Sequence, residues 1–128
     1  MKLQKFALGL AAAGFAIFGL LLFIAPGLLE SVGVGALSIS GKVELRAFYG
    51  GIELGLAAFF ALSARRPAWV TPALAALVFT MAGVVLLRGF ALLISGFQAN
   101  AVIYLSWVVE TFLFIIGLLA LIRYKSQD

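Results

Sequence analysis

Four long apolar runs dominate this sequence and restrict its fold more than any other feature. They cover about residues 4–25, 43–62, 71–94 and 101–122. An α-helix rises about 1.5 Å per residue, so about 20 residues cross the hydrocarbon core of a bilayer. Each run has about that length or more. The sequence therefore predicts an all-α fold, an integral membrane four-helix bundle, in which residues 1–128 form a single four-span domain.

The composition agrees with this fold and excludes several functions. Hydrophobic residues make up 65% of the chain and charged residues 11%, against roughly 45–50% and about 25% in soluble domains. The basic residues lie between the apolar runs and form no basic face, so we expect no nucleic-acid partner. Without cysteine or histidine, the chain has no thiol nucleophile, no histidine relay and no thiolate metal site. We therefore expect no catalytic residue, no metal and no cofactor.

The first apolar run and the segment after it need separate treatment. Lys2 and Lys5 precede the run, as in a signal peptide. The run is longer than the about 7–15 residues of a signal core, so we predict a retained span. Pro26 and the glycine after it end this helix. Residues 28–42 are too few to span and too apolar for an ordinary loop. We predict a short interfacial or re-entrant cap with Glu30 as a solvated carboxylate; a strand at residues 32–34 is the alternative.

The basic residues outside the spans predict the orientation of the chain. Four crossings place six of them on one side of the membrane and only Lys42 on the other. Because basic residues collect on the cytoplasmic side, both termini are predicted to be cytoplasmic. The expected location is the bacterial cytoplasmic (inner) membrane. The six residues are Lys2, Lys5, Arg65, Arg66, Arg123 and Lys125.

Five charged residues lie within the spans, where charges are costly. In this topology Glu53 lies about 15 Å, Glu110 about 13 Å and Arg88 about 9 Å below the outer surface. Glu44 and Arg46 lie in the first turn of the second span. A charge at the centre of a span costs roughly 2.5–3.5 kcal/mol. We predict that Arg88 lies between Glu53 and Glu110, and that one acid holds a proton because one arginine cannot neutralise both. Ion pairs that only fix which helices are neighbours are the alternative.

Aromatic residues are expected to surround this polar pocket, which we predict to open outward beneath the first loop. Three of them lie near the outer ends of the second and fourth spans: Tyr49, Tyr104 and Trp107. Tyrosine and tryptophan also anchor helices at the membrane surface, which is the alternative explanation for all three.

Small residues line the second span. At about 100° per residue, Arg46 and Glu53 differ by about 20° around this helix, and Gly50 lies between them on the same side. A neighbouring stripe of small residues allows close helix packing, either within the chain or in a dimer. The stripe consists of Ala47, Gly51 and Gly55.

The block from Glu44 to Gly51, ELRAFYGG, resembles the E-x-R-x-x-Y-G-G block of a widespread bacterial family of four-helix membrane proteins of unknown function. That family also has an arginine late in its third helix and an acid in its fourth, which correspond to Arg88 and Glu110. Here Gly89 follows Arg88 directly, which departs from the Arg-x-x-Gly element of the family. The resemblance covers nearly the whole chain and implies no activity. A more distant similarity to DoxX-like four-helix proteins implies a membrane accessory or redox-associated role.

Three hypotheses of function follow. The first is a non-enzymatic accessory or binding component whose partners are membrane lipid, another membrane protein or a second copy of the chain. The second is a small proton-coupled transporter that uses Glu53, Glu110 and Arg88. The third is a membrane enzyme acting on a lipid or isoprenoid. The sequence favours the first because nothing in it marks a nucleophile or a metal site.

Overall fold

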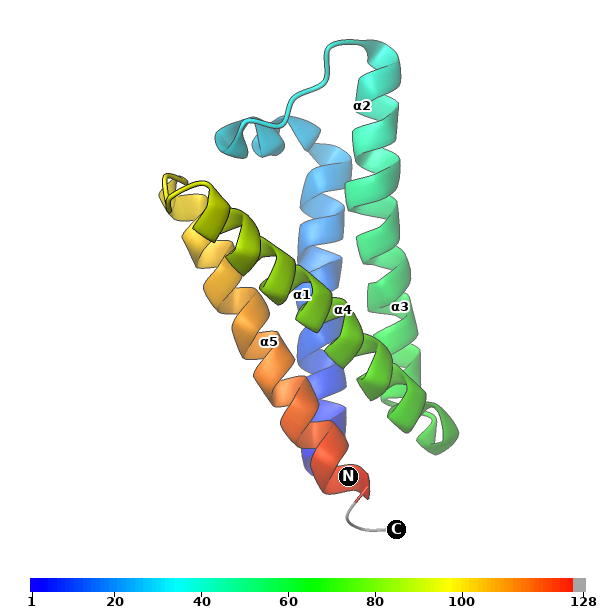
Figure 1. Cartoon of the computed structure of the whole chain (residues 1–128). Helices are drawn as coiled ribbons and strands as arrows, with labels where there is room; N and C mark the ends of the chain where they lie inside the picture. Colours follow the sequence, from blue (N-terminus) through cyan, green and yellow to red (C-terminus); the bar gives the residue numbers. More distant parts are fainter. Residues whose placement is uncertain (126–128) are drawn as a thin grey trace.

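The computed structural model describes residues 1–125, which form helices and connections but no strand (Figure 1). The α2, η2 and α3 elements follow one another without a break and form one long helix. The 3-10 helix η1 takes the place of the loop between the first two spans. The elements are α1 (Lys2–Ile24), η1 (Pro26–Val32), α2 (Ile39–Leu45), the π-helical segment η2 (Arg46–Gly51), α3 (Ile52–Ser63), α4 (Pro67–Ile94) and α5 (Ala101–Lys125).

Four helices are long and apolar enough to cross a membrane, which confirms the all-α prediction and fits a multi-pass membrane protein. The second and third of them begin four residues earlier than predicted. The second begins at Ile39 because Ser38 caps it, its Oγ accepting a hydrogen bond from the Gly41 amide at 3.1 Å. The third begins at Pro67, since proline suits the first turn of a helix. The alternative of a strand at residues 32–34 is wrong, because η1 extends to Val32 and no strand follows it.

The helices run up and down between two ends of the bundle (Figure 1). The N-terminus, the end of α5 and the connection between α3 and α4 lie at one end, called here the terminal end. The opposite end, called the cap end, contains residues 25–38 and the turn of residues 95–100. α1 packs mainly against α3 and η2, and α4 packs mainly against α5. Because α1 also contacts α4 and α5, it joins the two helix pairs.

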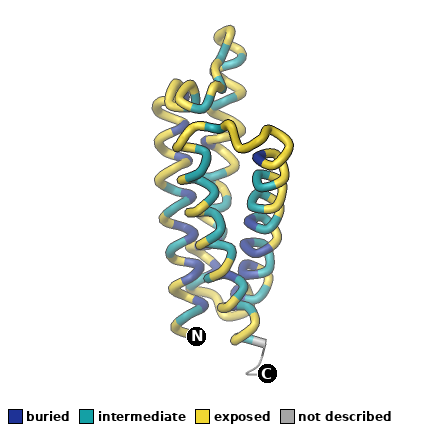
Figure 2. Tube along the Cα trace, turned by 60° about the vertical axis from the view of Figure 1, so that its left-hand side comes forward, coloured by how far each residue is buried: buried dark blue, intermediate teal, exposed yellow. Residues whose placement is uncertain are grey.

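The hydrophobic core lies toward the terminal end, where Figure 2 shows most of the buried positions. Leu8, Phe60 and Leu74 are fully buried there, and the rings of Phe15 and Phe60 meet edge to face at 5.5 Å. Toward the cap end, α4 and α5 expose large apolar side chains such as Leu87. A helix that is apolar all round and exposed in this way fits a lipid environment.

Candidate functional site

Arg88 on α4 and Glu110 on α5 form an ion pair between the last two long helices. The Arg88 Nε donates to the Glu110 Oε2 at 2.8 Å, and the Arg88 Nη2 donates to the Glu110 Oε1 at 2.8 Å. Two parallel hydrogen bonds make this a bidentate pair, the stronger geometry for arginine and a carboxylate. The side chains are only 29% and 19% exposed. The ion pair therefore links α4 to α5, and the Glu110 carboxylate occupies the fork of the Arg88 guanidinium.

Trp107 is a second tie between the same two helices. Its indole Nε1 donates to the Val85 carbonyl of α4 at 3.0 Å. Its ring lies over Gly89, where a Cβ atom would come within 3.0 Å of the Trp107 Cζ2. The glycine directly after Arg88 thus makes room for the ring, a role that the sequence analysis missed. Trp107 and Glu110 are three residues apart, so both reach α4 from one face of α5.

Glu53 on α3 stands apart from this pair. Its side chain is half-buried, and the Glu110 carboxylate is near enough to act on it electrostatically. Among residues 1–125, no hydrogen bond or ion pair to the Glu53 carboxyl is found. This differs from the predicted position of Arg88 between two acids. The physical reason is that α5 is the main neighbour of α4, so Arg88 meets Glu110 and one carboxylate fills its fork.

Three residues of the second long helix lie against α1. The Arg46 Nε donates to the Phe23 carbonyl at 2.9 Å. A Cβ atom on Gly50 would lie 2.9 Å from the Phe23 Cβ, and one on Gly19 would lie 3.0 Å from the Glu53 Cβ. Arg46, Gly50 and Glu53 therefore share the face that faces α1, consistent with their angular spacing. Gly19 is the partner that allows the close approach.

The other predicted pocket residues lie elsewhere. Glu44 and Tyr49 are exposed, and the Tyr104 hydroxyl donates to the Phe97 carbonyl of the α4–α5 turn at 2.6 Å. Tyr49 and Tyr104 therefore do not surround the Arg88–Glu110 pair as the sequence predicted for the aromatic residues. Of the two kinds of packing expected for the small-residue stripe, packing within the chain is not seen, because its residues are exposed and no atom lies within 4 Å of a Cβ on either glycine. The stripe is Ala47, Gly51 and Gly55.

The block that carried the family resemblance coincides with an unusual backbone. The segment η2, Arg46–Gly51, is π-helical, a rare conformation that is found mostly as single turns and often at functional sites. Two consecutive glycines weaken the α-helix at its end. The wider π turn begins at Arg46, the residue that reaches the end of α1.

The fold and this site define a class: an all-α protein with four helices able to span a membrane and an ion pair between the last two. A family model described as a domain of unknown function, DUF4345, matches residues 3–121, and the chain belongs to this family. No curated protein and no solved structure matches the chain. The resemblance to a family of unknown function is thus confirmed, while the DoxX-like similarity stays a prediction. Among the described residues, no group of three acidic side chains converges as a metal site would require.

Proposed function

We propose that this chain is a non-enzymatic accessory or binding component of a membrane, and that Glu53 is the residue that meets a polar group of its partner. With both termini on the cytoplasmic side, Arg88 and Glu110 lie in the outer half of the bilayer. Glu53 lies near its middle. One observation carries the proposal: Glu53 is half-buried and without a bonding partner among residues 1–125, because Arg88 pairs with Glu110 instead. An ionisable group in such surroundings is costly unless another group satisfies it.

The Arg88–Glu110 pair has a different role in this proposal. Its bidentate geometry, together with the Trp107 bond to α4, holds α4 and α5 in one arrangement. Ion pairs that fix helix neighbours need no ligand. Around the pair, α5 exposes Leu105 and Phe112 and is the least buried of the four long helices. The exposed apolar face of α5 suits lipid or a helix of another membrane protein. Glu53, on α3, is then the polar group that can hydrogen-bond to the partner.

Co-purification in mild detergent tests this proposal. The wild-type chain is expected to retain a membrane protein in stable amount, and Glu53→Leu to reduce the recovered partner at least about tenfold. A hydrogen bond to a charged group is worth about 1.5–3 kcal/mol, and every 1.4 kcal/mol is a factor of about ten in affinity. Glu44→Leu is the matched control, because Glu44 is an exposed acid on the same helix. Recovery of the wild type as a lone species, or full retention by Glu53→Leu, would contradict the proposal.

A further inference from the structure

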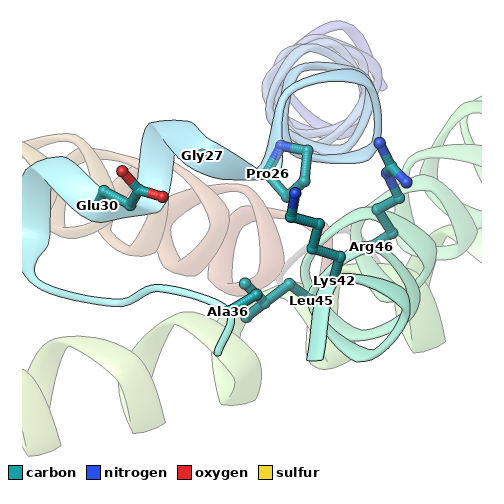
Figure 3. A pocket seen from close by; sticks show the side chains of 7 residues that line it. All are labelled: Pro26, Gly27, Glu30, Ala36, Lys42, Leu45 and Arg46. Carbon is teal, nitrogen blue, oxygen red and sulfur yellow. The ribbon is translucent and has the colours of Figure 1, made fainter. Parts of the chain in front are cut away.

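A hollow with charged side chains in its lining lies at the cap end, away from the Arg88–Glu110 pair and sharing no residue with it. It has a volume of about 210 Å³ and lies between the end of α1, η1 and the first turns of the second long helix. This is much more than the about 30 Å³ that one water occupies in the liquid. We call it the cap pocket. Three charged side chains line it, from Glu30, Lys42 and Arg46 (Figure 3).

Two cations form one side of the cap pocket. In Figure 3 the Lys42 side chain extends toward Pro26 at the start of η1, and the Arg46 side chain extends toward the end of α1. Arg46 is held there by the bond from its Nε to the Phe23 carbonyl, which leaves the N–H groups of its two terminal nitrogens available. Within residues 1–125, Lys42 has no hydrogen bond or ion pair through its side chain. Two cations that line one pocket favour an anion there, and phosphate suits both.

The Glu30 carboxylate forms the other side of the cap pocket. Glu30 extends from η1, with its carboxylate directed toward Gly27 in Figure 3. A Cβ on Gly27 would lie 3.9 Å from the Glu30 Oε1, and one on Gly35 would lie 3.6 Å from its Cγ, so the side chain lies between two glycines. Among the described residues, Glu30 pairs with neither Lys42 nor Arg46. The pocket therefore presents separated charges of opposite sign.

The wall that carries Glu30 is fixed by the neighbouring helix pair. The Asn100 Nδ2, at the start of α5, donates to the Ser31 carbonyl at 2.6 Å. The Ser31 hydroxyl donates back to the Leu28 carbonyl at 2.8 Å within η1. On the opposite wall, Arg46 is tied to α1. Both charged walls are thus positioned before a ligand arrives, which lowers the entropy cost of binding.

We propose that the cap pocket binds the headgroup of a zwitterionic phospholipid, with the phosphate at Lys42 and Arg46 and a primary ammonium at Glu30. The charge pattern matches a group that carries both signs a few atoms apart. The pocket also lies beside the end of α1 and the first turns of the second long helix, and helices that cross a bilayer end near its headgroups. A soluble phosphate ester has the same phosphate chemistry, and the experiment separates the two sources. The proposal does not depend on the role of Glu53.

Native mass spectrometry of the full chain in detergent tests the assignment with five probes. Three are phospholipids with ethanolamine, glycerol or choline headgroups, and two are soluble, glycerophosphoethanolamine and inorganic phosphate. We expect the ethanolamine lipid to bind most tightly. Lys42→Gln, which removes a charge, and Ala36→Leu, which fills the pocket without changing charge, are each expected to weaken it about tenfold or more. Glu30→Gln is expected to abolish the preference for ethanolamine over glycerol.

Lys5→Gln is the matched control, since it removes an exposed cation at the terminal end. It is expected to leave lipid binding unchanged. Unaltered ethanolamine-lipid binding by Lys42→Gln would overturn the proposal, even where Ala36→Leu fails to fold. So would an unaltered headgroup preference in Glu30→Gln. Equal affinity for the soluble probes and the lipids would assign the pocket to a soluble phosphate ester. If Lys42→Gln loses lipid binding but still co-purifies with the membrane protein of the proposed function, the cap pocket and Glu53 are separate sites.

Discussion

Glu110→Gln is expected to lower the free energy of unfolding by about 3 kcal/mol, the low end of the cost of removing one partner of a buried ion pair, because this pair is partly buried. The arginine cannot give up its proton, so Arg88 stays charged between α4 and α5 after its carboxylate is gone. The low exposure of both side chains means that little solvent is at hand to replace the lost bonds. Unfolding in mixed micelles, followed by circular dichroism as the denaturing detergent fraction rises, measures the change.

A double-mutant cycle with Arg88→Gln separates pairing from general loss of polarity. We expect the double variant to lose clearly less than the sum of the two single losses, because neither charge is then left alone. Glu44→Gln is the control, an exposed acid whose replacement is expected to change stability by less than about 0.5 kcal/mol. Additive losses, or a Glu110→Gln variant as stable as Glu44→Gln, would show that the pair does not hold the two helices together.

Gly50→Ala is expected to cost about 1–3 kcal/mol in the same assay, because the added methyl overpacks the crossing of the second long helix with α1. Its Cβ would lie 2.9 Å from the Phe23 Cβ and 3.3 Å from the Gly19 carbonyl oxygen. Neither atom belongs to the mobile end of a side chain, so the two helices themselves must move apart.

Gly55→Ala is the matched control on the same long helix. No atom lies within 4 Å of a Cβ at this position, so the methyl meets open space. Glycine inside a helix is less favourable than alanine by roughly 0.5–1 kcal/mol, and the expected change is therefore a small gain in stability. Equal losses in the two variants would mean that the Gly19–Gly50 crossing does not limit the approach of the helices.

The sequence predicted the four long apolar helices well, because the length and composition of a run determine whether its helix is able to cross a bilayer. It also predicted which residues share a face with Glu53, since about 100° per residue holds well enough from Arg46 to Glu53. The boundaries moved by a few residues where local chemistry decides them. Ser38 starts the second long helix by capping it, and Pro67 starts α4.

The partners of the charged residues could not be predicted, for two physical reasons. A helix that is apolar on every side has no single hydrophobic face, so its sequence does not indicate which side is exposed. The exposure of the small-residue stripe that contains Gly51 could therefore not be predicted. Choosing between two carboxylates for Arg88 needs the packing of α4 on α5, which is a tertiary property. Gly19 lies within an apolar run, and nothing in the sequence marks it as the residue that lets the second long helix approach α1. Glu30 was expected to be a solvated carboxylate, and only the position of η1 brings it to the cap pocket.

Cysteine labelling in intact cells tests the central claim most directly, namely four crossings with the cap end outside and the terminal end in the cytoplasm. The chain has no native cysteine, so single replacements report one position each. Ser40→Cys and Gln98→Cys at the cap end are expected to react with a membrane-impermeant maleimide, and Ala68→Cys, beside the α3–α4 connection, only after permeabilisation; all three positions are exposed. Labelling of Ala68→Cys in intact cells, or protection of the two cap-end cysteines, would contradict this account.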